Sequence, residues 1–253
     1  MKTREDLDNL NNIEVTLKSL KANHFGARFA QTASEAKEMI LEMIPLTACI
    51  GVGDSTTLRQ LGIIKELVGR GNKVINPFTR ELTQRMKEDP AILKIFRQAQ
   101  RRTFGADVFL TSANALTEDG KIVSIDRVGN RVAGTIFAAE KVILPIGRNK
   151  IVQNVDDALF RIKNVIAPAH ARRKERKTPC AVTGKCDDCN SPDRICNVTV
   201  ILEKKPLHTD LSVILINEDM GLGWNSAWDE KRINKIRSDY YQNTWLFSTQ
   251  KSK

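Results

Sequence analysis

The sequence predicts an α/β fold in which a mostly parallel sheet is flanked by helices, and two observations predict it. Short, nearly continuous apolar runs, such as residues 48–53 and 141–146, are typical of strands that are buried on both faces. Between such runs lie longer segments whose apolar residues recur every three or four positions, as they do in amphipathic helices. Strands that alternate with helices in this way favour a parallel sheet with helical layers.

The first 46 residues are expected to form an N-terminal helical segment. The apolar face of its first helix comprises Leu7, Leu10, Ile13, Leu17 and Leu20. A second helix is expected after Thr32, because Thr32 and Glu35 have the spacing of a capping box.

Residues 47–222 are expected to form the α/β domain itself. Strands are predicted at 48–53, 73–76, 107–112, 121–126, 141–146, 198–203 and 211–216. A helical stretch over 79–102 is expected to break at Asp89-Pro90, which supplies an N-cap and a first-turn proline. A polar turn at 118–120 separates two of the strands and suggests some antiparallel additions to the sheet.

Residues 223–253 are expected to form an aromatic C-terminal tail. It contains Trp224, Trp228, Tyr240, Tyr241 and Trp245, which include every tryptophan and tyrosine of the chain. Such rings are costly to leave in water, so we expect them to dock on the body of the domain or on a second subunit of a homo-oligomer.

The composition is that of an ordinary globular protein with a formal net charge of +10. Basic residues gather at 97–102 and 172–177, but no aromatic residues interleave with them, so nucleic acid is not the favoured partner. Such runs are more often solvated helix ends, and attraction to anionic small molecules is as plausible an explanation as attraction to nucleic acid. The charged N-terminus and the lack of a long apolar run predict a cytoplasmic protein without a membrane span.

The first segment that could carry chemistry is a glycine-containing junction between a strand and a helix. Its candidate ligand-binding residues are Gly51, Gly53, Asp54, Ser55, Thr56 and Thr57. Glycines permit close ligand approach, and hydroxyls with free N–H groups at a helix start can hold phosphate or carboxylate. Alternatively, Asp54 or Ser55 only caps the helix. The segment matches neither the Walker pattern nor the dinucleotide fingerprint.

A second segment, 111–120, contains Glu118 among polar residues and is followed by Asp126 and by Gly129-Asn130-Arg131. A half-buried glutamate can act as a base or a nucleophile. The alternative is a simple hairpin turn, because Glu-Asp-Gly is favourable turn chemistry.

A third segment contains four of the five cysteines, Cys180, Cys186, Cys189 and Cys196, with the spacing C-x5-C-x2-C-x6-C. Four thiolates on one loop can surround a [4Fe–4S] cluster or a structural zinc ion, and metal-free thiols remain an alternative. The fifth cysteine, Cys49, lies in a strand-like run and is expected to be a small core residue.

These segments also resemble a known family. The runs GVGDSTTLRQLG (51–62), ADVFLTSANALTEDGKIVSID (106–126), GNRVAG (129–134) and NEDMGLGW (217–224) resemble the lactate utilization (LUD) domain family. The run PCAVTGKCDDCNSPDRIC (179–196) is similar to that of its cysteine-containing branch. The resemblance implies a fold like those of ribose-5-phosphate isomerase, glucosamine-6-phosphate deaminase and the CoA transferases.

The resemblance also implies a role in bacterial use of lactate or related acids, through a reaction that is poorly defined for the family. By this resemblance, the glycine loop corresponds to a phosphate or CoA-type site. Residues 117–120 resemble the turn that carries the acyl-accepting glutamate of CoA transferases. Asp119 replaces the asparagine of that turn, which puts the same chemistry at Glu118 in doubt. Asn114, Asp126, Asn130, Arg131 and Asn217 are expected to add polar contacts to a small organic acid, phosphate or thioester. Arg131 is the expected carboxylate or phosphate partner, and its replacement by Ala is expected to weaken ligand binding and leave the fold intact. The alternative function is that of a non-catalytic iron–sulfur subunit. Such a subunit would transfer electrons or act as a scaffold with other lactate-utilization subunits.

Overall fold

The structure, a computed structural model, describes residues 4–244 of the chain. Its main element is a six-stranded sheet in the order β1-β10-β7-β4-β2-β3, with every neighbouring pair parallel. The strands of this sheet are β1 (Gly26–Ala30), β2 (Cys49–Val52), β3 (Lys73–Ile75), β4 (Val108–Leu110), β7 (Lys141–Gly147) and β10 (Asp210–Ile216). The expected α/β fold class is confirmed.

A second, four-stranded sheet has the order β8-β5-β6-β9 and is mostly antiparallel. Its strands are β5 (Ala115–Thr117), β6 (Ile122–Asp126), β8 (Ile151–Val152) and β9 (Val198–Leu202). The expected antiparallel additions therefore form a sheet of their own. The turn at 118–120 joins β5 to β6, whereas β4 belongs to the parallel sheet.

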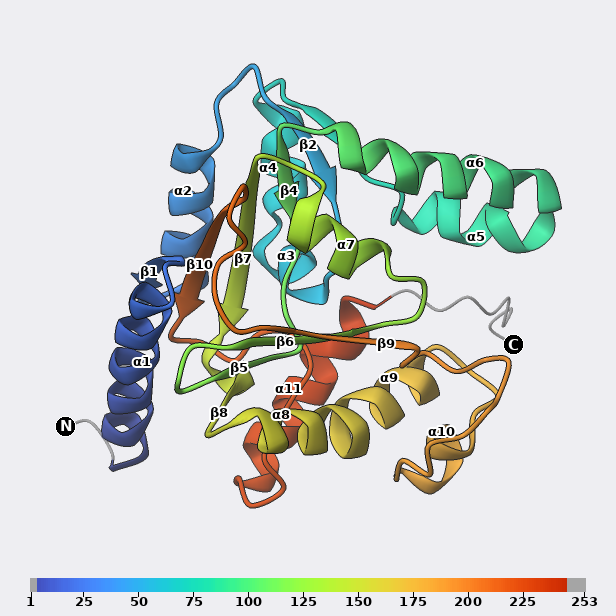
Figure 1. The fold of residues 1–253 in the computed structure, drawn as a ribbon. Helices are drawn as coiled ribbons and strands as arrows, with labels where there is room; N and C mark the ends of the chain where they lie inside the picture. The colour runs from blue at the N-terminus through green and yellow to red at the C-terminus, as the bar shows by residue number, and fades with distance from the viewer. Residues whose placement is uncertain (1–3, 245–253) are drawn as a thin grey trace.

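The helices are α1 (Arg4–Ala22), α2 (Ala33–Met43), α3 (Thr56–Leu61), α4 (Ile63–Gly69), α5 (Arg80–Glu88), α6 (Pro90–Arg102), α7 (Asn130–Phe137), α8 (Val155–Arg161), α9 (Ala167–Arg173), α10 (Pro179–Thr183) and α11 (Glu230–Gln242). Most of the helices lie against the two sheets, whereas α5, α6 and α10 lie further out (Figure 1). Helices α5 and α6 form a hairpin that extends from the body, and α8, α9 and α11 lie beside the four-stranded sheet (Figure 1). The helical stretch after β2 is divided into α3 and α4 at Gly62, whose φ of 65° ends α3.

Three apolar clusters fill the spaces between these layers. The first joins α2, α3 and α4 to the parallel sheet, with Ile40, Leu58 and Ile50 fully buried. The second lies between the two sheets and α1, and the third packs α8 and α11 on the four-stranded sheet. Strands β7 and β10 are buried along nearly their whole length, as expected for the centre of a parallel sheet.

The two ends of the chain are integrated into this body more closely than the sequence suggested. The N-terminal segment 1–46 contains α1 and α2, but it also contains β1, which pairs with β10. In the tail, Trp224 and Tyr240 are buried in the third cluster, at 7% and 2% exposure. The tail therefore docks on the body of the same chain; Trp245 lies outside the described residues.

Two local predictions about helix ends are confirmed. The Thr32 side chain accepts a hydrogen bond from the backbone N–H of Glu35 and caps α2. Asp89 caps α6 by accepting from the N–H of Ala91, and Pro90 occupies the first turn. Both helices begin at these residues because the capping side chain accepts a hydrogen bond from a backbone N–H that has no partner inside the helix.

Gly51 permits a close backbone approach inside this fold. A Cβ at this position would lie 2.5 Å from the carbonyl oxygen of Thr103, which cannot move as a side chain can. We therefore expect Gly51→Ala to lower the free energy of unfolding by about 1–3 kcal/mol in urea denaturation, the usual range for overpacking. Gly69→Ala is the control, because an added Cβ there meets nothing within 4 Å. Equal stability of both variants would show that the close approach at Gly51 is not a constraint.

Candidate functional site

A cavity of about 580 Å³ opens beside the carboxyl ends of three neighbouring strands of the parallel sheet, β2, β4 and β7. The segments that follow these strands contribute Asp54–Thr57, Ser112–Asn114 and Lys150 to its wall. Residues of α6, α9 and α11 complete the lining. This edge is where ligands bind in open α/β sheets, because the loops after adjacent parallel strands meet there.

The structure brings most of the predicted ligand-binding residues together around this cavity. Those that line it are Asp54, Ser55, Thr56, Thr57, Asn114, Asp126, Asn130 and Arg131. Gly51, Gly53, Asn217 and Glu118 are not among the lining residues. The placement agrees with a shared binding site for the first group, and its binding role stays a prediction.

The two glycines of the first segment support packing beneath the cavity. Gly51 lies against Thr103, and a Cβ at Gly53 would lie 2.7 Å from Thr111 Oγ1. The residues after them have partly structural roles as well. Ser55 caps α3 by accepting from the N–H of Leu58, as the capping alternative anticipated.

Asp54 lies at the cavity wall with its carboxylate already paired. Burial alone would raise the pKa of this carboxyl. Its pKa is nevertheless lowered to about 2, because the charges of Arg59 and Lys174, a hydrogen bond from Arg59 and the proximity of His170 outweigh burial. The Arg59 guanidinium donates directly to Asp54. Asp54 is therefore a fixed negative charge at neutral pH.

Arg131 and Asp126 are both held by backbone groups. The Arg131 guanidinium donates to the carbonyl oxygens of Ser112 and Ile125, at 2.8 and 2.5 Å, and to Asn114 Oδ1 at 2.9 Å. Asp126 accepts from the N–H groups of Val128, Arg131 and Val132 and so caps α7. Arg131 thus connects the segment after β4 to β6. We therefore expect Arg131→Ala to destabilise the fold, whereas the sequence led us to expect an intact fold.

Lys150 is a cavity residue that the sequence analysis did not identify. It is only 4% exposed, and its Nζ donates to Thr57 Oγ1 at 3.0 Å and to Ser112 Oγ at 2.9 Å. Burial, with repulsion from Arg131, lowers the pKa of Lys150 to about 7. The surrounding run 148–150 is short and polar and has no sequence pattern that would have identified it.

A second group that the sequence analysis missed lies where α9 meets α11. His170, Lys174 and Tyr240 all line the cavity, and Nδ1 of His170 forms a short hydrogen bond with the Tyr240 hydroxyl. Burial, then the charge of Lys174, lowers the pKa of His170 to about 3, so this ring is neutral. Burial also lowers the pKa of Lys174, to about 8, despite the nearby Asp54. Only the tertiary contact between α9 and the tail brings these residues together.

Glu118 occupies the opposite end of the β5–β6 hairpin from the cavity. Asn114 precedes β5 and Asp126 ends β6, whereas Glu118 follows β5 in the turn, about 13 Å further along at the usual rise of a strand. The turn lies against α1, where Asn23 Nδ2 donates to the carbonyl oxygen of Asp119. This placement favours the hairpin-turn alternative, and it gives the predicted catalytic role no support.

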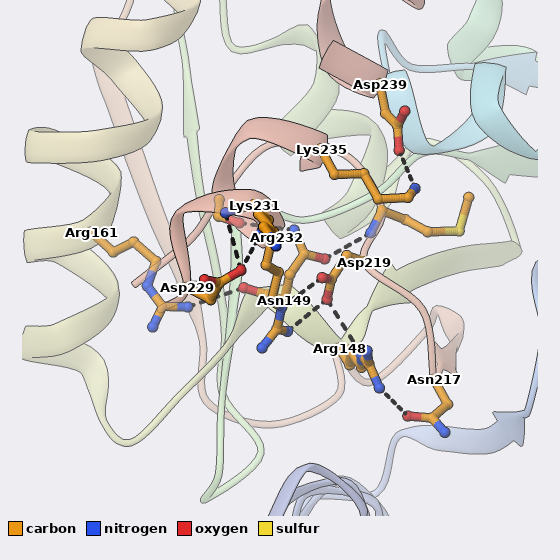
Figure 2. Close-up of polar contacts among 12 residues, drawn as sticks. Arg148, Asn149, Arg161, Asn217, Asp219, Asp229, Lys231, Arg232, Lys235 and Asp239 are labelled. Carbon is orange, nitrogen blue, oxygen red and sulfur yellow. Dashed lines mark hydrogen bonds and ion pairs between the residues drawn. The ribbon is translucent and has the colours of Figure 1, made fainter. Parts of the chain in front are cut away.

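Asn217 belongs to a separate polar network that fixes the segment after β10. Arg148 donates to Asn217 Oδ1 at 3.3 Å and also contacts Asp219, which Arg232 of α11 binds through two nitrogens at 2.7 Å (Figure 2). Buried Asn149 accepts from the N–H of Met220. The NEDMGLGW run therefore holds the tail to the sheet.

The four cysteines of the third segment share one loop region. All are half-buried thiols without disulfides. Burial raises the pKa of the Cys196 thiol, and the charge of Arg194 partly opposes this rise. Cys186, Cys189 and Cys180 raise the pKa of Cys196 further. These three cysteines therefore lie within electrostatic range of Cys196.

The turn inside the C-x2-C pair is also ordered. Asp188 adopts a left-handed φ of 52°, and its N–H donates to Cys186 Sγ at 3.4 Å. Arg194 donates to the carbonyl oxygen of Cys189 at 2.6 Å. Across residues 4–244, no three Cys, His, Asp or Glu side chains are already arranged to hold a metal ion. The donor set fits a zinc ion or an iron–sulfur cluster in its chemistry, and the loop would have to close around either.

This loop contacts the wall of the cavity. Asp193 forms ion pairs with Arg127 at 3.4 Å and with Arg176 at 3.8 Å, and both arginines line the cavity. Ile195, next to Cys196, also lines it. The cysteine loop and the cavity are therefore neighbouring parts of one region.

The fold and the cavity together define an α/β protein with a polar, cationic pocket at the carboxyl edge of a parallel sheet. The LUD domain family matches residues 13–216, and the chain belongs to that family. A DUF162 family protein from Deinococcus radiodurans has a similar solved structure, with 15% identity, a TM-score of 0.44, and coverage of 83% of this chain and 98% of that one. A comparison with curated proteins found no match.

Within the described part of the chain, none of the helices has the length and apolar character needed to cross a membrane.

The low pKa of Lys150 gives a testable dependence of stability on pH. In the unfolded chain a lysine has a pKa of about 10.4, so between about pH 7 and 10 the unfolded state binds more protons than the folded state. Stability should therefore rise with pH in the native protein relative to Lys150→Met, by at most about 1.4 kcal/mol per pH unit. Urea unfolding at several pH values measures this difference, with exposed Lys65→Met as the control. Parallel pH profiles for all three proteins would mean that Lys150 keeps an ordinary pKa.

Proposed function

We propose that this LUD domain protein binds a small anionic metabolite, an organic acid, phosphate or thioester, in the cavity, as part of a lactate-utilization type of function. The charge of the lining is the observation that carries the proposal. Among the described residues, the lining includes two carboxylates, Asp54 and Asp126, and six cationic side chains, Arg59, Arg97, Arg127, Arg131, Lys174 and Arg176. A volume of about 580 Å³ suits a ligand of metabolite size.

The two carboxylates do not neutralise this lining. Asp54 is bound to Arg59, and Asp126 accepts from three backbone N–H groups. Asp193 from outside the lining offsets part of the charge of Arg127 and Arg176. The buried guanidinium of Arg131 donates instead to the neutral oxygens of Ser112, Asn114 and Ile125. Because a buried cation is costly without a counter-charge, a bound anion would stabilise this arrangement.

The remaining lining suits a ligand with an apolar part. Leu93 and Phe96 of α6, together with Leu222 after β10, contribute apolar surface to the same cavity. Ser55 and Thr56 contribute hydroxyl groups that can orient an oxygen-rich group. A carboxylate or phosphate would lie toward Lys150 and Lys174, and the body of the ligand toward α6.

Removing one cavity cation should weaken anion binding. We expect Lys174→Met to weaken the binding of lactate, pyruvate or acetyl-CoA by about 10- to 100-fold, the value of one charge-assisted hydrogen bond. Isothermal titration calorimetry measures the change, and Lys65→Met on the surface of α4 is the control. Failure of the native protein to bind any of these anions, or equal binding by both variants, would contradict the proposal.

A second proposed function rests on the clustering of the four cysteines. Cys180, Cys186, Cys189 and Cys196 would hold a [4Fe–4S] cluster, with zinc as the alternative, and a cluster would supply one-electron transfer when bound. Arg194 and the Asp188 N–H would orient the loop and tune the charge around the sulfurs. In this case the protein is an electron-transfer or scaffold subunit that works with other lactate-utilization subunits.

The cysteine site can be tested separately from the cavity. Elemental analysis after anaerobic purification should find iron, or zinc for the alternative, bound to the native protein and largely lost in Cys189→Ser. Cys49→Ser should keep the metal, because Cys49 lies in β2, outside the loop. Native protein that contains neither metal would contradict the site, and iron rather than zinc would support the electron-transfer subunit.

A further inference from the structure

Lys150 lies at the point where the segments after four adjacent strands meet. The order of the parallel sheet places β10, β7, β4 and β2 side by side. Lys150 follows β7, its partner Thr57 follows β2, and its partner Ser112 follows β4. The segment after β10 contributes Gly221, where an added Cβ would lie 2.9 Å from Lys150 Nζ. Each of the four segments therefore approaches the amine closely.

The contacts of Lys150 suit an uncharged amine. A neutral amine has two N–H bonds and one lone pair, and Lys150 Nζ donates two hydrogen bonds, both to hydroxyl oxygens. Ser112 in turn donates to the carbonyl oxygen of Pro145, which fixes its oxygen as the acceptor for Lys150. With both N–H bonds used in this way, the lone pair remains for a reacting group in the cavity that Lys150 lines.

The electrostatic surroundings favour the same state. Burial and the neighbouring positive charge of Arg131 both disfavour a proton on Lys150 and lower its pKa to about 7. Lysines that are desolvated beside another cation are activated as nucleophiles for carbonyl groups. Cationic side chains, among them Arg131 and Lys174, line the same cavity and would attract an anionic group of the same ligand.

We propose that Lys150 is a nucleophile that forms an imine with the carbonyl group of an anionic metabolite, such as a 2-oxo acid. This inference rests on the proposed anion-binding function and identifies the ligand class more closely. The amine nitrogen bonds to the carbonyl carbon and gives a carbinolamine, with the amine proton passing to the oxygen. Loss of water then gives the imine, so no oxidant or reductant is required. The hydroxyls of Thr57 and Ser112 position Lys150 for this addition.

Reductive trapping tests the proposal on the full-length native protein. Pyruvate and dihydroxyacetone phosphate serve as probes with a carboxylate and a phosphate, and hydroxyacetone serves as the uncharged probe. Sodium cyanoborohydride reduces any imine to a stable secondary amine, and peptide mass spectrometry locates it. We expect an adduct at Lys150 at least tenfold more abundant than at exposed lysines such as Lys65. The more reactive anionic probe distinguishes a carboxylate ligand from a phosphate ligand.

Two variants control for the role of charge and for folding. Lys150→Arg places a permanent cation at this position and cannot form an imine, and Lys150→Met has neither an amine nor a charge. Both should lose the adduct. Adduct mapping on the native protein remains decisive if either variant fails to fold.

The outcomes separate this inference from the proposed function. Pyruvate that binds in calorimetry without labelling Lys150 would overturn the imine and leave anion binding intact. Labelling of Lys150 by hydroxyacetone as efficient as by both anionic probes would support the nucleophile but contradict an anion-selective cavity. Adducts spread evenly over exposed lysines would overturn the assignment of Lys150.

Discussion

The architecture of the site depends on the convergence of parallel strands on one buried amine. Lys150 joins the segments that follow β7, β4 and β2 through its bonds to Ser112 and Thr57. Parallel strands end at the same edge of a sheet, so these segments meet there although they are far apart in the sequence. Gly221 completes the arrangement, since a side chain there would collide with both Lys150 and Thr57. The geometry of the cavity is thus fixed by the sheet and by a small polar cluster.

The same convergence sets the electrostatic character of the cavity. Carboxylates are present, but the helix cap on α7 engages Asp126, and Arg59 engages Asp54. Cationic side chains therefore outnumber carboxylates among the described residues of the lining, and burial lowers the pKa of both Lys150 and Lys174. The proposed anionic ligand would offset this imbalance, whereas a neutral or cationic ligand would not.

The sequence predicted the fold class and much of the site, and the misses have physical causes. Apolar runs identified β2, β7 and β10 because strands buried on both faces have a distinct composition. Strands β5 and β8 have only three and two residues, too few to show a period. Glycines and hydroxyls after β2 predicted the position of the cavity, but Lys150, His170 and Tyr240 meet only through tertiary packing. Local pattern therefore finds the edge of the sheet and misses the side chains that converge there from elsewhere.

Asp193 connects the cysteine loop to the wall of the cavity. This carboxylate pairs with Arg127 and Arg176 on the cavity wall, and it also accepts from the N–H of Lys177 at the start of the cysteine segment. Any closure of the loop around a metal ion or cluster would therefore act on the position of Asp193 and on the charge that faces the cavity. Conversely, an anion that draws Arg176 inward would weaken its pairing with Asp193. A metal ion or cluster at the cysteines and an anion in the cavity would therefore act on the same ion pairs of Asp193.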